Sequence, residues 1–227
     1  MSDTGPALPE RLEAVRSRVA DAIREAGRAP SEVTTIVVTK FHPAALVRDL
    51  FELGVRDVGE NRLQDAGPKA AELADLDLTW HFIGQLQSKK ARAVLEFAHS
   101  IHSVDRDSLV TALGATGERT DVFIQVNLTE DENRGGVWPA QLEPFASSVL
   151  DQPRLRLRGL MAVAPLGEDP RRAFARVRES SELLRRLAPE AVSLSMGMSG
   201  DFRAAILEGA THLRIGTAIT GNRPDGG

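Results

Sequence analysis

The chain has 227 residues, of which 42% are hydrophobic and 26% are charged, a composition typical of soluble globular proteins. Its formal net charge of −4 gives no electrostatic reason to expect a nucleic-acid partner, and no apolar run is long enough to cross a membrane. Cys is absent, which excludes disulfides, thiolate metal ligands and cysteine nucleophiles. The start lacks a basic region followed by an apolar one, so we expect a cytoplasmic protein.

Short strand patterns alternate with helix patterns along the whole chain. Residues 8–27 carry apolar side chains at helical spacing, and Thr34–Lys40 is β-branched and mostly apolar, which is typical of a strand buried on both faces. We expect further strands at Asp57–Glu60, Trp80–Gly84, Ser100–Asp105, Asp121–Asn127, Leu157–Ala164, Leu194–Gly197 and His212–Gly216. We expect helices at Pro43–Leu53, Asn61–Leu73 (around an awkward Pro68), Ser88–Ala98, Arg106–Leu113, Pro139–Leu150, Asp169–Leu187 and Asp201–Gly209.

Eight strands with a helix after each of the first seven predict a (β/α)8 TIM barrel with an additional N-terminal helix. That leading helix could fill the place of the missing eighth. No change in composition marks a linker, so residues 1–227 are expected to form a single domain, with 1–7 and 224–227 as loose tails. The alternative is an open doubly wound sheet, which usually carries a glycine fingerprint after its first strand. Here that strand ends in Lys40-Phe41-His42-Pro43, so the barrel is favoured.

The segment from Ser193 to Asn222 brings glycines and hydroxyl groups to two strand ends beside the start of a helix. These are the Met-Gly-Met-Ser-Gly turn at residues 196–200 and the pair Gly216-Thr217. Free N–H groups and the helix dipole favour an anion at a helix start, and TIM barrels often bind phosphate after strands seven and eight. Ordinary strand-to-helix turns also use Gly and Ser. The agreement of two separate inferences favours a phosphate site.

Lys40 ends the first apolar strand, so its amine would emerge into the mouth of the barrel. A Lys that is partly desolvated and close to other positive groups can form a Schiff base. A Lys that merely extends from a strand end into solvent is the plainer interpretation. Because this Lys would face a phosphate site, an aldehyde phosphate is the favoured ligand, above all pyridoxal phosphate (PLP).

Arg214 lies two residues before Gly216 and therefore points to the same side of its strand. Inside a barrel its guanidinium could reach the pyridine nitrogen of PLP, keep that nitrogen unprotonated and weaken the ring as an electron sink. The alternative is a structural ion pair with an inward acid such as Glu60. His81, between Trp80 and Phe82, is more often a packed strand histidine than a catalyst.

Seven segments occur in an order that resembles a known family: VVTKFHP, GENRLQ, WHFIGQLQSKK, IQVNLTEDENRGG, LRGLMAVAP, LSMGMSGD and LRIGTAITG. Together they are similar to the pyridoxal-phosphate homeostasis proteins, the single-domain relatives of the N-terminal barrel of alanine racemase. The resemblance runs from about residue 10 to residue 223. It implies a barrel that holds PLP as an aldimine on Lys40.

The resemblance also implies further cofactor-binding residues. Asn61 of the Gly-Glu-Asn motif would lie near the cofactor, and Arg214 would face the pyridine nitrogen. The phosphate would be bound by the segment after strand seven and by the end of strand eight, through Ser195, Met196, Gly197, Ser199, Gly216 and Thr217.

Three functions remain open for such a site. A carrier would bind PLP reversibly, buffer it and deliver it to apo-enzymes through transient contacts; the resemblance favours this function, and we expect a monomer. An amino-acid racemase needs a proton donor on each face of the substrate, which alanine racemase supplies with Lys and with a Tyr from a second domain. This chain has no Tyr, and we expect no second domain, so at most slow side reactions are expected. A Schiff-base sugar-phosphate lyase is a third possibility.

Overall fold

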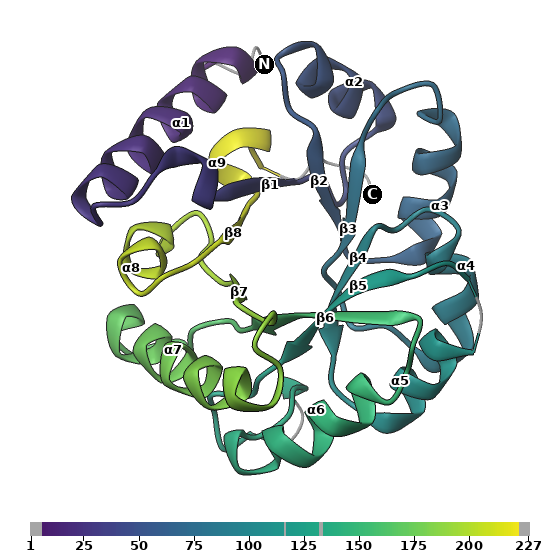
Figure 1. The fold of residues 1–227 in the computed structure, drawn as a ribbon. Coiled ribbons are helices and arrows are strands. Elements are labelled where there is room, and N and C mark those ends of the chain that lie inside the picture. The colour runs from purple at the N-terminus through teal and green to yellow at the C-terminus, as the bar shows by residue number, and fades with distance from the viewer. Residues whose placement is uncertain (1–5, 116, 132–133, 223–227) are drawn as a thin grey trace.

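Eight parallel strands form a closed barrel in the computed structural model, which describes residues 6–115, 117–131 and 134–222 (Figure 1). Each strand pairs with the next, and β8 pairs with β1 to close the cylinder. The strands are β1 Thr34–Val38, β2 Asp57–Glu60, β3 Thr79–Phe82, β4 Ser100–Val104, β5 Thr120–Gln125, β6 Leu155–Met161, β7 Ser193–Ser195 and β8 His212–Ile215. The predicted TIM barrel is confirmed.

Helices surround the barrel on its outside, as Figure 1 shows. The α-helices are α1 Leu8–Glu25, α2 Ala44–Glu52, α3 Leu63–Glu72, α4 Ala91–Leu95, α5 Asp107–Gly114, α6 Leu142–Leu150, α7 Pro170–Leu187, α8 Phe202–Leu207 and α9 Thr217–Thr220. Short 3-10 helices lie at η1 Pro30–Glu32, η2 Ser88–Lys90 and η4 Pro139–Gln141. No helix within the described ranges is both long and apolar enough to span a membrane.

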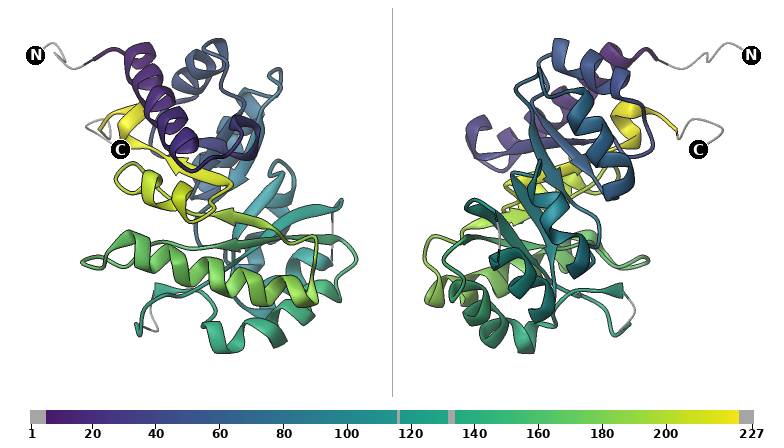
Figure 2. Two further views of the ribbon diagram at one scale, coloured as in Figure 1. Left: turned by 60° about the vertical axis from the view of Figure 1, so that its left-hand side comes forward. Right: turned by 90° about the vertical axis from the view of Figure 1, so that its right-hand side faces the viewer.

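The N-terminal helix α1 fills the place of an eighth barrel helix, as predicted. It packs against α8 and α9, and both views of Figure 2 show it beside the yellow α9. Its apolar stripe of Leu12, Val15, Val19 and Ile23 is buried. The Nε atom of Arg11 donates a hydrogen bond to the carbonyl oxygen of Ile219 (2.7 Å), so the first helix is tied to the last.

The outer side of the barrel wall is apolar, whereas the inner side carries polar side chains together with apolar ones such as Phe123. Side chains such as Val37, Val58 and Ile124 belong to the hydrophobic core that joins the sheet to its helices. The barrel interior instead carries a connected set of polar side chains that includes His81 and His102. TIM barrels usually fill this space with branched apolar residues, so the interior polar set needs a separate explanation.

Several predicted boundaries differ from the structure. β1 ends at Val38, so Lys40 lies in the following turn and not at the strand end. The helix predicted at Ser88–Ala98 is divided into η2 and the five-residue α4, and α9 was not predicted. Pro68 does lie inside α3. The predicted tails, residues 1–7 and 224–227, lie outside the described residues except for positions 6 and 7.

Candidate cofactor site at the barrel mouth

Lys40 lies in a tight turn that follows β1. A hydrogen bond from His42 N to Thr39 O (3.1 Å) closes this turn, and Phe41 adopts a positive φ of 70°. Positive φ is uncommon for a bulky residue, and backbone strain of this kind concentrates at functional sites. The Nζ atom of Lys40 lies 5.7 Å from the centroid of the Phe41 ring, and Arg62 Cζ lies 5.5 Å from the same centroid. Two cations therefore share one aromatic ring beside the turn.

A buried ion pair supports the peptide group that precedes Lys40. Lys69 Nζ donates to Glu60 Oε1 (2.5 Å) and to the carbonyl oxygen of Thr39 (3.0 Å), and Thr39 Oγ1 donates to the same carboxylate oxygen (2.7 Å). All three residues are buried. Because burying one charge alone is costly, Lys69 and Glu60 stabilise each other only as a pair, and together they hold the backbone that carries Lys40.

Two buried acceptors at the end of β2 have no hydrogen-bond donor among the described residues. They are Glu60 Oε2 and Asn61 Oδ1. Asn61 lies in the bend after β2, and its backbone approaches Gly84 so closely that a Cβ atom at position 84 would lie 2.2 Å from Asn61 O. Buried acceptors are normally paired, so these two atoms mark a place where a donor is missing.

Arg214 lies inside the barrel and is almost fully buried. Its Nη1 atom donates to the carbonyl oxygen (2.6 Å) and the hydroxyl (2.8 Å) of Ser195, and its Nη2 atom donates to the carbonyl oxygen of Ala162 (2.9 Å). Burial lowers the pKa of Arg214 to about 10, which leaves it charged at neutral pH. The alternative of a structural ion pair with an inward acid such as Glu60 is wrong for the described residues, because Arg214 contacts Ser195 and Ala162 while Glu60 is paired with Lys69.

The loops after β7 and β8 bring Ser199, Gly216 and Thr217 together. The hydroxyl of Ser199 accepts a hydrogen bond from Ala218 N (3.4 Å), within the first turn of α9. Gly216 lies beside the end of β1, since a Cβ atom at this position would be 3.5 Å from Val38 Cβ. A hydroxyl and backbone N–H groups therefore meet just beyond the end of β8, the strand that pairs with β1.

The other predicted residues of the β7 segment face elsewhere. The side chain of Met196 belongs to the hydrophobic core, and its N–H donates to the carbonyl oxygen of His212 (3.0 Å). Gly197 has a φ of 93°, and a Cβ atom there would lie 2.6 Å from the Cβ of Ala205. Ser195 is fully buried beneath Arg214. These three positions support the loop rather than line its open side.

Comparison with known proteins assigns nearly the whole chain to one family. Residues 11–224 match the family described as alanine racemase, N-terminal domain. The pyridoxal phosphate homeostasis protein of Pseudomonas aeruginosa is 45% identical over 226 residues, which cover 96% of this chain and 97% of that protein. The chain belongs to the pyridoxal phosphate homeostasis protein family.

Solved structures support this membership in the family. The structure of PipY from Synechococcus elongatus with PLP bound is 39% identical, has a TM-score of 0.82, and is matched over 95% of this chain and 100% of that chain. Alanine racemase from Corynebacterium glutamicum has a TM-score of 0.70 at 19% identity, and the match covers 95% of this chain and 62% of that one. At this identity the second likeness concerns the fold alone.

The geometry of this family member also includes groups that the sequence patterns did not single out. Lys69 and Thr39 hold the Lys40 turn, and His102 contacts Ser195 beneath Arg214. A Lys in the middle of a helix gives no sequence signal that it is buried. Because successive side chains of a strand alternate between its two faces, Ser100 and His102 could have been placed on one face of the sheet from the sequence.

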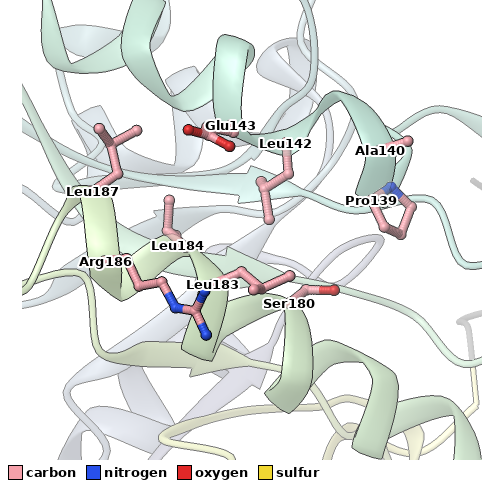
Figure 3. A pocket seen from close by; sticks show the side chains of 9 residues that line it. All are labelled: Pro139, Ala140, Leu142, Glu143, Ser180, Leu183, Leu184, Arg186 and Leu187. Carbon is pink, nitrogen blue, oxygen red and sulfur yellow. The ribbon is translucent and has the colours of Figure 1, made fainter.

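A separate groove lies on the outer helical layer between η4–α6 and α7 (Figure 3). It has a volume of about 360 Å³, and its apolar lining includes Leu142, Leu183, Leu184 and Leu187. Its residues come from helices on the outside of the barrel, whereas Lys40, Ser199 and Gly216 follow the carboxyl ends of the strands. The groove is therefore not part of the candidate site.

Proposed function

We propose that this protein binds PLP in the mouth of its barrel, as an aldimine with Lys40, and acts as a cytoplasmic, monomeric carrier that buffers the cofactor and delivers it to apo-enzymes. One observation supports this most strongly. The Lys40 turn follows β1, and Gly216 and Thr217 follow its paired neighbour β8, where Ser199 from the loop after β7 contacts Ala218 N. An amine that can join an aldehyde and a group of anion donors therefore lie on adjacent strand ends, as an aldehyde phosphate requires.

The residues present fit the cofactor. Asn61 Oδ1 is a buried acceptor without a donor among the described residues, next to the end of the strand that pairs with the Lys40 strand. Arg214 uses three N–H contacts on Ser195 and Ala162, and a guanidinium carries five N–H groups, so it retains capacity for an acceptor such as a ring nitrogen. At Gly200 a Cβ atom would meet nothing within 4 Å, so the loop beside Ser199 is open.

Each group then has a distinct role. PLP would supply an aldehyde, and Lys40 would supply the amine that condenses with it, with loss of one water. Ser199, Gly216 and Thr217 would bind the phosphate through a hydroxyl and backbone N–H groups. Arg214 would donate a hydrogen bond to the ring nitrogen. Because its pKa is about 10, its guanidinium is charged at neutral pH and cannot accept a proton from that nitrogen. Lys69 and Glu60 would hold the Lys40 turn in place.

Three arguments favour a carrier over an amino-acid racemase. The chain contains no Tyr, the residue type that serves as the second proton donor in alanine racemase. The P. aeruginosa relative is named for homeostasis and not for a reaction. An arginine that keeps the ring nitrogen unprotonated also weakens the ring as an electron sink, which suits storage better than catalysis.

The deciding experiment is an absorbance spectrum of the purified protein with PLP added, before and after borohydride, followed by peptide mass mapping. We expect a yellow protein that bleaches on reduction and carries the adduct on Lys40. Lys40→Ala should abolish the adduct, whereas Lys89→Ala, on the 3-10 helix η2, should retain it. A protein that stays colourless would contradict the proposal and favour a sugar-phosphate lyase.

Delivery is tested by mixing the PLP-loaded protein with a PLP-dependent apo-enzyme in the presence of an excess of a scavenger of free PLP. A carrier should restore the enzyme's activity faster than the same amount of free PLP does under these conditions. Equal rates of activation by the loaded protein and by free PLP would mean that the protein stores PLP without delivering it.

A further inference from the structure

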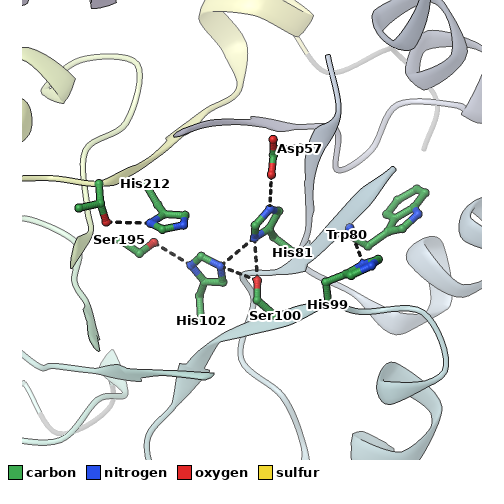
Figure 4. Close-up of polar contacts among 9 residues, drawn as sticks. Asp57, Trp80, His81, His99, Ser100, His102, Ser195 and His212 are labelled. Carbon is green, nitrogen blue, oxygen red and sulfur yellow. Dashed lines mark hydrogen bonds and ion pairs between the residues drawn. The ribbon is translucent and has the colours of Figure 1, made fainter. Parts of the chain in front are cut away.

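A continuous set of hydrogen bonds crosses the barrel interior from Arg214 to Asp57. Figure 4 shows its part from Ser195 to Asp57. Arg214 Nη1 contacts Ser195 Oγ (2.8 Å), which contacts His102 Nδ1 (2.7 Å). His102 Nε2 lies 3.0 Å from Ser100 Oγ and 3.1 Å from His81 Nδ1. Ser100 Oγ lies 2.7 Å from His81 Nδ1, and His81 Nε2 lies 2.9 Å from Asp57 Oδ1. These hydrogen bonds join residues from β2, β3, β4, β7 and β8.

The donors and acceptors of this set can be assigned from its two ends. Arg214 can only donate, so Ser195 Oγ accepts from it. The hydroxyl hydrogen of Ser195 then goes to His102 Nδ1, because no other contact within the described residues offers it an acceptor. His102 must therefore carry its proton on Nε2, which donates to Ser100 Oγ. Ser100 donates to His81 Nδ1, and His81 Nε2 donates to the carboxylate of Asp57.

Reversing the direction of these hydrogen bonds would leave one hydrogen, that of the Ser195 hydroxyl, without an acceptor. If His102 carried its proton on Nδ1, Ser195 Oγ would receive hydrogens from both His102 and Arg214, and its own hydrogen would have no partner among the described residues. A buried hydroxyl without an acceptor costs about 1–3 kcal/mol. The fully satisfied arrangement therefore has one direction, from the cation Arg214 to the anion Asp57, and two neutral histidines between them.

We propose that His102 is a positioning residue for Arg214, acting through the Ser195 hydroxyl. By accepting the Ser195 hydrogen at Nδ1, His102 turns the lone pairs of Ser195 Oγ toward Arg214 and fixes the guanidinium in the orientation in which it meets the cofactor ring. The inference rests on the proposed function, because it concerns how the barrel presents Arg214 to PLP.

The surroundings of His102 favour the neutral imidazole that this role needs. Its ring is fully buried and stacks on Phe123, with ring centroids 4.3 Å apart and an interplanar angle of 20°. Burial is the largest of the causes that hold the pKa of His102 well below its usual value. A neutral histidine can accept at one nitrogen and donate at the other, whereas an imidazolium donates at both.

The direct test uses protein labelled with ¹⁵N-histidine, without and with PLP, and NMR spectra that connect each ring nitrogen to the ring protons. At pH 7 we expect His102 to carry a proton on Nε2 and none on Nδ1. A proton on Nδ1, or on both nitrogens, would overturn the proposal. This measurement needs no variant, so it does not depend on whether a substituted protein folds.

A set of variants tests the effect on PLP binding. His102→Leu removes the acceptor and should weaken PLP binding about tenfold, since it leaves a buried hydroxyl without its acceptor. His102→Asn places an amide oxygen near the position of Nδ1 and should recover most of the affinity. On a Ser195→Ala background, His102→Leu should have little further effect, because the link to Arg214 is already absent. His99→Asn, at an exposed histidine whose contact is Trp80 N, is the matched control.

The two proposals fail in different ways. If the unaltered protein does not bind PLP, the proposed function is wrong. If it binds PLP but His102→Leu and His102→Asn bind it equally well, or the effect of His102→Leu is unchanged by Ser195→Ala, only the positioning role is wrong.

Discussion

Lys69 donates a hydrogen bond to the carbonyl oxygen of Thr39, the peptide group that leads directly into Lys40. The same ammonium group is paired with the buried carboxylate of Glu60. A helix on the outside of the barrel thus determines the backbone position of the proposed cofactor anchor. The arrangement links the stability of the barrel to the geometry of the site.

Lys69→Met should lower the free energy of unfolding by about 3–5 kcal/mol, because it leaves a buried carboxylate without its partner. Denaturant unfolding measures this loss. The double variant Lys69→Met with Glu60→Gln should be less damaging than Lys69→Met alone, since no charge is then left unpaired. Equal losses would mean that the ion pair is not the cause.

Gly197→Ala should destabilise the fold by about 2–4 kcal/mol. The residue has a φ of 93°, and the new Cβ would lie 2.6 Å from the Cβ of Ala205, so both strain and overlap oppose the side chain. Gly200→Ala, in the same loop, is the matched control: its Cβ would meet nothing within 4 Å, and we expect a change within about 0.5 kcal/mol. Thermal unfolding of the two variants side by side distinguishes them.

Acid should unfold the protein through the barrel histidines. Burial lowers the pKa of His212 from 6.5 to about 4, and the pKa of His102 is also lowered. A histidine whose folded pKa is depressed stabilises the fold above its unfolded pKa, and this stabilisation is lost as the pH falls from about 6.5 toward the folded value. His212 alone should account for about 3 kcal/mol between pH 7 and pH 4.

Urea unfolding at several pH values tests this slope. The groups that face His212 with opposing effects are His81 and Arg158, which lower its pKa, and Asp57 and Asp121, which raise it. His212→Asn should flatten the dependence between pH 6.5 and pH 4, whereas His99→Asn should leave it unchanged. An equally steep slope in His212→Asn would assign the effect to other groups.

Arg11→Gln should loosen α9 by removing the hydrogen bond from Arg11 Nε to Ile219 O. We expect a loss of about 1 kcal/mol in stability and faster amide hydrogen exchange in Thr217–Thr220. Arg24→Gln, whose ion pair with Asp21 is fully on the surface of the same helix, should change neither quantity measurably. Unchanged exchange in Arg11→Gln would show that α9 is held by other contacts.

The barrel could be predicted from the sequence because its strands and helices have distinct periodicities, and the strand ends then placed Lys40, Asn61, Ser199 and Gly216 on one face. The short helix α9 was missed because four residues are too few to show a helical period. The end of β1 was placed two residues too far along, since the apolar pattern of Thr34–Val38 continues into Thr39.

The interior hydrogen bonds could not be predicted in the same way. His81 contacts His102 because β3 and β4 pair with His81 opposite Ser100, and nothing in either segment alone determines that register. The interpretation of His81 as a packed strand residue is correct in its burial but omits its hydrogen bonds to Asp57 and Ser100. Lys69 was missed because a sequence does not reveal which surface lysine turns inward.

The contact between Arg11 and Ile219 joins residues that are 208 positions apart in the chain. Ribosomes add roughly 5–20 residues per second, so α1 would wait roughly 10–40 seconds before α8 and α9 exist to cover its apolar stripe. During that interval Leu12, Val15, Val19 and Ile23 remain uncovered on the nascent chain. Because α1 fills the last helical position from the opposite end of the chain, its apolar stripe is exposed to chaperones and to aggregation for longer during synthesis.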